Sequence, residues 1–325
     1  MVAKFALLGA AGYIAPRHMK AIHDVGGDLV AACDPYDGVG VLDRHFPDCR
    51  FFTEVERFDR HLEKMRRRAD QTPVDYVTIC TPNYLHDAHC RLALRLHAHA
   101  ICEKPLVISP WNLDQLAAIE SEYGRRVYTV LQLRLHSEAI RLREAIAARG
   151  GERVEVNLSY ITRRGPWYQR AWKGSDEKSG GVAMNIGIHF FDLLIWLFGP
   201  VEQSAVTLRE VDRMRGTLTL KGARVNWFLS IRGRDLPPEV QARGQHAYRA
   251  LTIVDAEFDF STGFDDLHTR VYQEVLAGRG HGLEDARASI ELVHQLRHAP
   301  LRTPSTPPTF ARRPRPSAGP DEMTS

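Results

Sequence analysis

Two polar side chains interrupt an apolar run near the middle of the chain, and one of them is suited to proton transfer. The run is GGVAMNIGIHFFDLL at residues 180–194, and the two residues are Asn185 and His189. Because they are four positions apart, a helix places them on one face. An imidazole with an ordinary pKa of about 6.5 exchanges a proton near neutral pH. His189 is therefore a candidate general base, although a lone histidine in an apolar helix is more often a core residue. Asp192, on the same segment, is expected to be structural.

A glycine turn near the start of the chain is suited to binding a dinucleotide. The turn reads GAAGYIA at residues 9–15, a looser relative of the GxGxxG fingerprint. Gly9 would permit a tight turn, and Gly12 would let backbone amides approach a pyrophosphate at the N-terminus of the next helix. Asp34 ends the second predicted strand, 25 positions after Gly9. A carboxylate there accepts both ribose hydroxyls of NAD and repels the 2′-phosphate of NADP, so we predict NAD as the cofactor.

The first half of the chain alternates short apolar strands with helices, which predicts a doubly wound parallel sheet. We assign residues 1–125 to this Rossmann domain. Two of the strands end in the triplets Thr81-Pro82-Asn83 and Glu103-Lys104-Pro105, and ligands bind at the carboxyl ends of strands in such sheets. The predicted cofactor contacts are therefore Gly9, Gly12, Tyr13, Ile14, Asp34, Thr81, Pro82, Asn83, Glu103 and Lys104.

The second half has a different pattern and predicts a separate domain. Residues 153–164 alternate apolar and polar side chains, and 217–231 and 250–261 read as hairpins, the first turning at Lys221-Gly222. We assign residues 126–298 to an α+β domain with a mainly antiparallel open sheet, for substrate binding and oligomerisation. Residues 299–325 hold seven prolines and predict a disordered tail.

Composition excludes several classes of protein. The 325 residues carry 43 basic and 40 acidic side chains, too even a balance to indicate nucleic acid or a membrane surface as partner. The five cysteines lie mostly in apolar runs and favour buried thiols in the cytoplasm. No uninterrupted apolar stretch reaches the ~18 residues of a membrane span, and no metal-ligand spacing is present, so we predict no metal. His86 and His89 are expected to be solvent-exposed residues of a helix.

Glu103-Lys104-Pro105 followed by GGVAMNIGIHFFD resembles the glucose–fructose oxidoreductase, inositol dehydrogenase and MocA family (Gfo/Idh/MocA), over residues 1 to about 298. The resemblance implies a Rossmann domain, a C-terminal α/β domain, and catalytic roles for Lys104 and His189. Many members have Asp where Asn185 stands. Longer strings, such as YITRRGPWY and WKGSDEKSGG, resemble one branch of nucleotide-sugar dehydrogenases. That branch oxidises the C3 hydroxyl of UDP-N-acetylglucosaminuronate in the synthesis of bacterial surface polysaccharide (O-antigen) precursors.

A substrate with a diphosphate and a carboxylate requires basic, forked donors. The candidate substrate contacts are Gln132, Arg134, Arg163, Trp167, Tyr168, Lys173, Asn185 and His189. The resemblance also implies 2-oxoglutarate as a second ligand in some members, and a homodimer or homotetramer.

Three other functions are weighed against this one. The glycine turn is shared with short-chain dehydrogenases, but none of the ten tyrosines has the lysine four residues on that those enzymes require. A dehydrogenase of another sugar or a cyclitol has the same fold and the same candidate base. A non-catalytic NAD-binding sensor would have no use for Lys104 and His189, and both are present.

Overall fold

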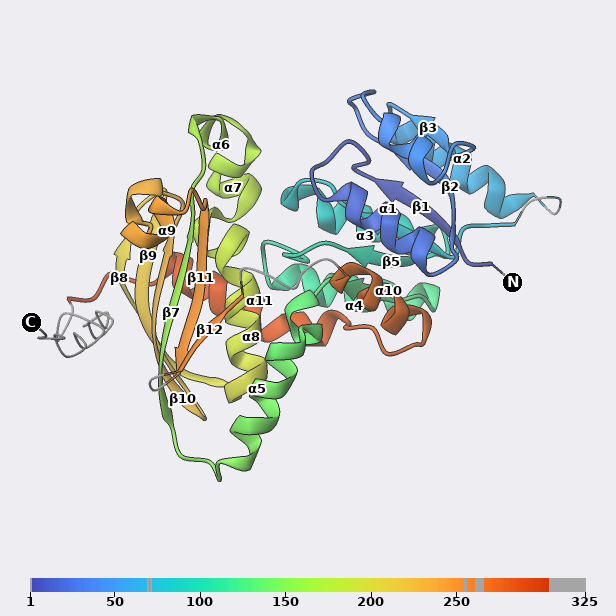
Figure 1. Ribbon diagram of the computed structural model, residues 1–325. Coiled ribbons are helices and arrows are strands. Elements are labelled where there is room, and N and C mark those ends of the chain that lie inside the picture. Colours follow the sequence, from blue (N-terminus) through green and yellow to red (C-terminus); the bar gives the residue numbers. More distant parts are fainter. Residues whose placement is uncertain (1, 69, 71, 254–255, 261–265, 304–325) are drawn as a thin grey trace, which may run out of the picture.

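The first lobe of the molecule is a parallel six-stranded sheet covered on both faces by helices (Figure 1). The computed structural model describes residues 2–68, 70, 72–253, 256–260 and 266–303. The strand order is β3-β2-β1-β4-β5-β6, so the chain reverses direction across the sheet between β1 and β4. The strands are β1 (Lys4–Leu8), β2 (Asp28–Cys33), β3 (Arg50–Phe52), β4 (Tyr76–Ile79), β5 (His99–Cys102) and β6 (Val127–Thr129).

Alternating side chains of the central strand anchor helices on opposite faces of this sheet. Phe5 and Leu7 of β1 pack into one core, and Ala6 and Leu8 pack into the other. The first core is covered by α1 (Ala15–Asp24) and α10 (Leu267–Leu276), which lie side by side. The second is covered by α2 (Val55–Arg67), α3 (His86–Arg95) and α4 (Trp111–Tyr123). The predicted doubly wound parallel sheet is confirmed.

The first lobe extends further along the chain than the predicted boundary at residue 125. β6 pairs in parallel with β5 through Cys102 and Thr129, so residues 127–129 belong to the first sheet. α10 packs against α1 although it follows the second sheet in sequence. The apolar pattern of 126–135 indicated a strand but not which sheet it would join, because strand pairing depends on partners far away in sequence.

The second lobe is a mixed sheet with one face packed on helices. Its order is β12-β11-β7-β10-β9-β8, and every neighbouring pair is antiparallel except β7 with β10. The predicted hairpin turn at Lys221-Gly222 is confirmed, since Leu220 of β9 pairs with Ala223 of β10. The strands are β7 (Val154–Thr162), β8 (Val201–Arg209), β9 (Arg213–Leu220), β10 (Ala223–Ser230), β11 (Ala247–Ile253) and β12 (Ala256–Asp259).

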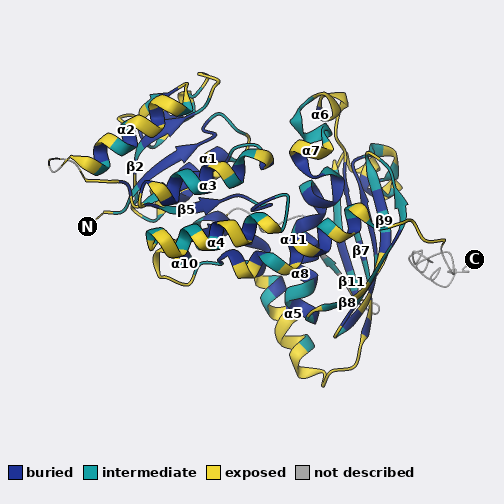
Figure 2. Cartoon of the chain, turned by 180° about the vertical axis from the view of Figure 1, so that it is seen from behind, coloured by how far each residue is buried: buried dark blue, intermediate teal, exposed yellow. Residues whose placement is uncertain are grey.

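The longer helices of the second lobe lie between its sheet and the first lobe, and their buried faces turn toward both (Figure 2), whereas the short helix at residues 238–242 packs through Val240 against Ile161 and Phe228 on the opposite face of the sheet. The longer ones are α5 (Ser137–Ala148), α8 (Ile188–Phe198) and α11 (Leu283–His298), and the short ones are α6 (Pro166–Arg170), α7 (Asp176–Ser179) and α9 (Pro238–Ala242). A π-helical turn, Ala183–Gly187, leads directly into α8. The outer face of the sheet carries the exposed positions of its strands.

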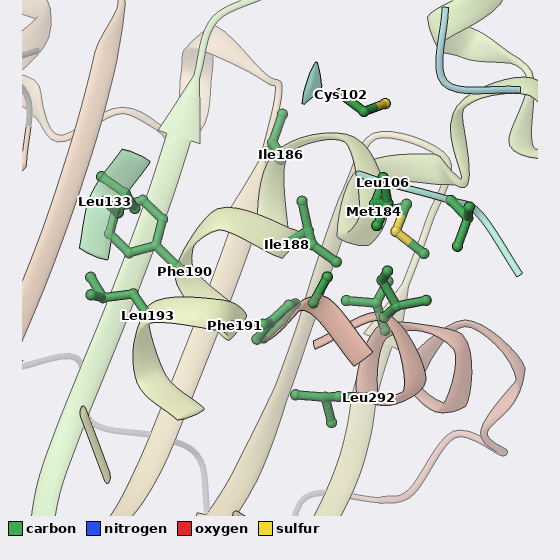
Figure 3. Close-up of a cluster of buried hydrophobic side chains, with 14 of the residues drawn as sticks. Cys102, Leu106, Leu133, Met184, Ile186, Ile188, Phe190, Phe191, Leu193 and Leu292 are labelled. Atoms are coloured by element: carbon green, nitrogen blue, oxygen red, sulfur yellow. The ribbon is translucent and has the colours of Figure 1, made fainter. Parts of the chain in front are cut away.

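Apolar side chains of the π-helical turn and α8 form a core that joins the two lobes (Figure 3). Ile186, Ile188 and Phe191 pack in one cluster with Leu106 of the first lobe and Leu292 of α11. The helical stretch Asp176–Phe198 has the length and apolar composition of a membrane-crossing helix, but 72% of its most apolar window is buried inside the protein. It is therefore the core helix of this fold, and its position beside the first lobe is fixed by packing.

Candidate active site

One large cavity opens at the carboxyl ends of the parallel strands and is lined by both lobes. Its volume is about 1440 Å³, enough for a dinucleotide and a second ligand. β1 ends at Leu8 and β4 at Ile79, so the cavity lies where the strand order reverses, the position at which doubly wound sheets bind ligands. Of the site residues predicted from sequence, the cavity wall contains Gly9, Gly12, Tyr13, Ile14, Asp34, Thr81, Pro82, Asn83, Glu103, Lys104, Gln132, Arg163, Tyr168, Lys173, Asn185 and His189.

The glycine turn is built for close approach of a ligand to the backbone. Gly9 has a φ of +88°, and a Cβ on it would lie 2.7 Å from the carbonyl carbon of Cys80. A Cβ on Gly12 would lie 3.1 Å from the carbonyl oxygen of Gly9. α1 begins directly after the turn at Ala15, whose N–H donates to the Gly12 carbonyl at 3.1 Å, and Tyr13 and Ile14 just before it line the cavity. The turn and helix together can bind a pyrophosphate.

The Asp34 carboxylate is held in place by backbone donors. Ala11 N–H donates to Oδ2 at 3.0 Å, and Tyr36 N–H donates to Oδ1 at 2.9 Å. An ionised carboxylate has about four acceptor positions, so two remain for the hydroxyls of a ribose. The bond from Ala11 also ties the end of β2 to the glycine turn, which gives Asp34 a structural role beside its predicted one.

Lys104 and His189 reach the cavity from different lobes and meet at the π-helical turn. Lys104 Nζ donates to the backbone carbonyl of Asn185 at 3.2 Å, and His189 lies four residues further along the same helical segment. π-helical turns occur frequently at functional sites. Among the described residues neither ring nitrogen of His189 has a hydrogen-bond partner. Both groups are thus available to a ligand in the cavity.

The pKa values of these two side chains suit proton transfer near neutral pH. Burial lowers the pKa of Lys104 to about 8; Glu103 opposes this, while Lys173, Arg164 and Arg249 add to it. Burial also holds the pKa of His189 well below its ordinary value, and the charge of Lys104 acts in the same direction. At neutral pH the imidazole is uncharged and can accept a proton, while most of the lysine is still an ammonium.

Cationic and aromatic side chains line the second-lobe side of the cavity. Arg163, Arg164 and Lys173 are joined there by Arg249, whose guanidinium lies 5.3 Å from the ring centre of Tyr160. Burial lowers the pKa of Lys173, and Arg164 adds to the effect. The Asn185 amide donates to the hydroxyl of Tyr168. This end of the cavity therefore favours a ligand that carries negative charge.

Two predicted substrate contacts lie elsewhere. Arg134 is 9% exposed and forms a bidentate ion pair with Asp192, at 2.9 and 2.7 Å, with a further bond to Asp285. It fastens η3 (Gln132–Leu135) to α8 and α11 and does not line the cavity. Trp167 is 76% exposed on α6, also outside the cavity. Sequence gave no indication that Arg134 would be paired, because Asp192 lies 58 positions away. Asp192 has the structural role expected of it.

Removing the Arg134 charge is expected to destabilise the protein without weakening substrate binding. In Arg134→Met, Asp192, which is 2% exposed, would be a buried carboxylate without its cation. Breaking such a pair costs about 3–5 kcal/mol of unfolding free energy. Urea denaturation measures the loss, and adding Asp192→Asn should recover part of it. A raised KM with unchanged stability would instead place Arg134 at the ligand.

Behind Lys104, a buried polar network connects α10 to the loop that carries Glu103 and Lys104. His18 Nε2 and His268 Nε2 lie 3.0 and 3.2 Å from the same oxygen of Glu103, and the Tyr272 hydroxyl lies 2.9 Å from His18 Nδ1. Burial alone would raise the pKa of Glu103, but the two imidazole hydrogen bonds outweigh it and hold the pKa well below its usual range. The Lys104 N–H donates to the other oxygen at 3.1 Å. Glu103 is therefore a carboxylate fixed beneath Lys104.

The same three side chains are of metal-ligand type, since the donor atoms of His18, Glu103 and His268 lie within 4.8 Å of one another. Donation from each imidazole N–H to the carboxylate accounts for the short contacts. The Tyr272 hydroxyl can donate to the other nitrogen of His18 and accept from Thr78, 2.8 Å away. Hydrogen bonding therefore accounts for the contacts of Glu103 and His18, and the absence of a metal stays a prediction.

The prediction that His86 and His89 are solvent-exposed is wrong. His86 is 1% exposed, and its ring nitrogens lie 2.7 Å from the carbonyl oxygen of Pro105 and 2.8 Å from that of Thr81. His89 Nδ1 lies 2.9 Å from Thr81 Oγ1. Both imidazoles thus brace the two strand-end triplets that border the cavity. Their spacing on α3 did not reveal that this face packs against loops.

Several cavity residues were not predicted from sequence. Among them are Arg17, Tyr36, Glu54, Glu56, Tyr160, His246 and Arg249. Asp34 was selected because it is an acidic residue at the end of a predicted strand. Glu54 could have been selected in the same way if the three-residue strand β3 had been recognised. Many basic residues follow the pair Gly180-Gly181. Arg249 could have been selected among them only if the pairing of β11 with β7 had been known.

The cavity fits a nicotinamide dinucleotide at its first-lobe end. The glycine turn leaves space for a pyrophosphate, Asp34 has free acceptor positions, and Gln132 offers a buried side-chain oxygen without a partner among the described residues. That oxygen can accept from an amide such as the nicotinamide carboxamide. With Lys104 and His189 at the far end, fold and cavity define a two-domain dehydrogenase that transfers a hydride to a nicotinamide cofactor.

Comparison with known proteins agrees with the assignment to the nicotinamide-dependent dehydrogenases. The model of the GFO_IDH_MocA oxidoreductase family, NAD-binding Rossmann fold, matches residues 3–131, and that of the family's C-terminal alpha/beta domain matches residues 146–234. The chain belongs to this NAD-binding oxidoreductase family. The predictions of the family, of NAD and of a dehydrogenase are thereby confirmed.

Individual relatives show how far the similarity extends. The WlbA (WbpB) dehydrogenase of Thermus thermophilus, solved with NAD and alpha-ketoglutarate and also with NAD and UDP-GlcNAcA, is 49% identical, with a TM-score of 0.90 over 94% of this chain and 97% of that one. Inositol 2-dehydrogenase of Rhizobium meliloti is 27% identical over 66% of this chain, and D-glucoside 3-dehydrogenase of Escherichia coli is 25% identical over 38%. These matches span 62% and 36% of the two curated relatives.

Proposed function

We propose that the protein oxidises the C3 hydroxyl of UDP-N-acetylglucosaminuronate to a ketone with NAD. The observation that carries the proposal is the meeting of Lys104 and His189 in one cavity whose second-lobe side is lined by cationic side chains. A nucleotide sugar acid brings a diphosphate and a carboxylate, which such side chains bind. The 49% identical Thermus thermophilus enzyme, solved with NAD and UDP-GlcNAcA, supports this choice of substrate.

In this proposal the two titratable side chains have separate roles. NAD, when bound, accepts the hydride from the sugar carbon. His189, uncharged at neutral pH, accepts the proton of the hydroxyl. The Lys104 ammonium stabilises the negative charge that develops on the oxygen, and the Asn185 carbonyl orients that ammonium. Glu103, fixed by His18 and His268, supplies the countercharge beneath it.

The direct test is oxidation of the nucleotide sugar by purified protein. NADH absorbance is followed with UDP-N-acetylglucosaminuronate, with UDP-N-acetylglucosamine, and with free inositol. The proposal expects turnover with the first only, since the second lacks the carboxylate and the third lacks the diphosphate. Turnover with inositol alone would replace the proposal by a cyclitol dehydrogenase.

Loss of the Lys173 charge is expected to weaken sugar binding more than catalysis. Lys173 is half-buried in the cavity wall, with its ammonium 5.6 Å from the ring centre of Trp172. A charge-assisted hydrogen bond contributes about 1.5–3 kcal/mol, so Lys173→Met should raise KM for the nucleotide sugar roughly 10- to 100-fold. Arg170→Met, an exposed cation of α6 outside the cavity, is the control. Unchanged KM in Lys173→Met would remove Lys173 from the substrate site.

The proposal includes 2-oxoglutarate as the oxidant that regenerates NAD in the same cavity. Support comes from the Thermus thermophilus relative, which was solved with NAD and alpha-ketoglutarate. A dicarboxylate suits the same cationic wall of Arg163, Arg164 and Lys173. Adding 2-oxoglutarate to enzyme and nucleotide sugar should yield 2-hydroxyglutarate in equal amount to the keto sugar. Formation of keto sugar without 2-hydroxyglutarate would mean that bound NADH is replaced by free NAD and is not reoxidised in the cavity.

We also propose a cytoplasmic homodimer or homotetramer that acts in the synthesis of bacterial surface polysaccharide precursors. The outer face of the second sheet is the proposed contact, because it carries the exposed strand positions of the second lobe. Light scattering after size-exclusion chromatography measures the mass. A particle of the monomer's 36.8 kDa would reject the oligomer.

A further inference from the structure

Two glutamates lie at the same end of the cavity as Asp34. β2 and β3 end together, since Cys33 pairs with Phe52 and the Asp34 N–H donates to the Phe52 carbonyl at 3.1 Å. Glu54 follows β3 after a single residue, and Glu56 lies in the first turn of α2. Side chains that follow neighbouring parallel strands occupy the same edge of the sheet. Asp34, Glu54 and Glu56 therefore face one region of the cavity, and all three line it.

The negative charges of all three carboxylates affect the same side chain in this region, the Cys33 thiol. The pKa of the Cys33 thiol is raised to about 11, mainly by burial and in addition by the negative charges of Asp34, Glu54 and Glu56. The positive charges nearby compensate little. Glu54 pairs with Arg57 at 3.5 Å, but both side chains are half exposed or more, and such pairs are weak. Arg17 lines the cavity from the first turn of α1, beside the glycine turn where the pyrophosphate binds.

We propose that Glu54 and Glu56 act with Asp34 to exclude NADP, so that three carboxylates rather than one determine the choice of cofactor. The two dinucleotides differ only at the adenosine ribose, where NADP carries a phosphate of about two negative charges and NAD an uncharged hydroxyl. Charges near this position repel the phosphate and leave NAD almost unaffected. The inference concerns the NAD site of the family and does not depend on which sugar is oxidised.

Cofactor binding without substrate tests the inference. The dissociation constants of NADH and NADPH are measured from the fluorescence of the reduced nicotinamide. Asp34→Ser is compared with Asp34→Ser/Glu54→Gln/Glu56→Gln, so that any disturbance of the Ala11 contact is common to both. We expect the triple variant to bind NADPH about tenfold more tightly than Asp34→Ser, with NADH affinity changed by less than about threefold. The gain should shrink as salt is raised, because the glutamates are exposed.

Glu122→Gln/Glu144→Gln, at exposed glutamates of α4 and α5 outside the cavity, controls for the change of two charges. Added to Asp34→Ser, it should leave NADPH binding unchanged. Equal NADPH affinity in Asp34→Ser and the triple variant would overturn the inference. An equal gain for NADH and NADPH would also overturn it, because the glutamates would then act on the part that both dinucleotides share. Either result would leave the proposed sugar oxidation intact.

Discussion

Replacing His189 with alanine is expected to lower kcat by about 10²–10⁴-fold and to leave the affinity for NAD within about threefold of the unmodified enzyme. The imidazole is the uncharged base at the cavity, with its pKa held well below the ordinary value by burial. Its removal takes away the proton acceptor but leaves in place the groups that surround the glycine turn. Turnover under saturating substrate and NADH fluorescence titration measure the two quantities.

The matched control for this substitution is His298→Ala, at an exposed histidine of α11. It should keep both kcat and NAD affinity. Turnover of His189→Ala equal to that of the control would refute the base assignment. A parallel loss of NAD affinity would instead show that His189 supports the cofactor site.

Replacing Lys104 should change the pH dependence as well as the rate. Loss of the ammonium in Lys104→Met is expected to lower kcat by about 10²–10³-fold, the effect of removing one donor to a developing oxyanion. Lys104→Arg keeps a cation that does not titrate in this range. We therefore expect the arginine variant to retain more activity than the methionine variant, although its fork cannot reproduce the contact of Lys104 with the Asn185 carbonyl.

The pH profile of kcat/KM reports these groups in the free enzyme. Activity needs the ammonium, so it should fall as pH rises through the Lys104 pKa of about 8. It also needs the neutral imidazole, whose lowered pKa places the acid limb below pH 6.5. Lys104→Arg should lose the limb near pH 8 and keep the acid limb. An unchanged alkaline limb in that variant would assign it to another group.

Local sequence patterns were sufficient to predict the parts of the structure that local chemistry determines. The glycine turn, the carboxylate at Asp34 and the polar triplets all depend on a strand ending next to the residue that acts. They were predicted to border the cofactor, and the structure places them in one cavity. The hairpin at Lys221-Gly222 is another such case, because its turn and its flanking strands are contiguous.

What could not be predicted depends on partners distant in the chain. Arg134 was selected as a substrate contact because it is basic and follows a strand, but Asp192 neutralises it across 58 positions. The Asn185 side chain was expected at the substrate, and its backbone carbonyl also holds Lys104, 81 positions away. Glu54 follows a strand of three residues, too short for any periodicity to reveal.

The contact of α10 with the first lobe has a consequence for how the chain folds while it is being synthesised. When residues 3–131 of a nascent chain have left the ribosome, the whole parallel sheet is present. His18 and Glu103 still lack their hydrogen-bond partners Tyr272 and His268. Phe5 and Leu7 also lack the apolar surface of α10 that completes their core. N-terminal domains generally fold first as they leave the ribosome. Here the loop that carries Lys104 gains its full support only when residue 276 has emerged, after all the described strands of the second sheet.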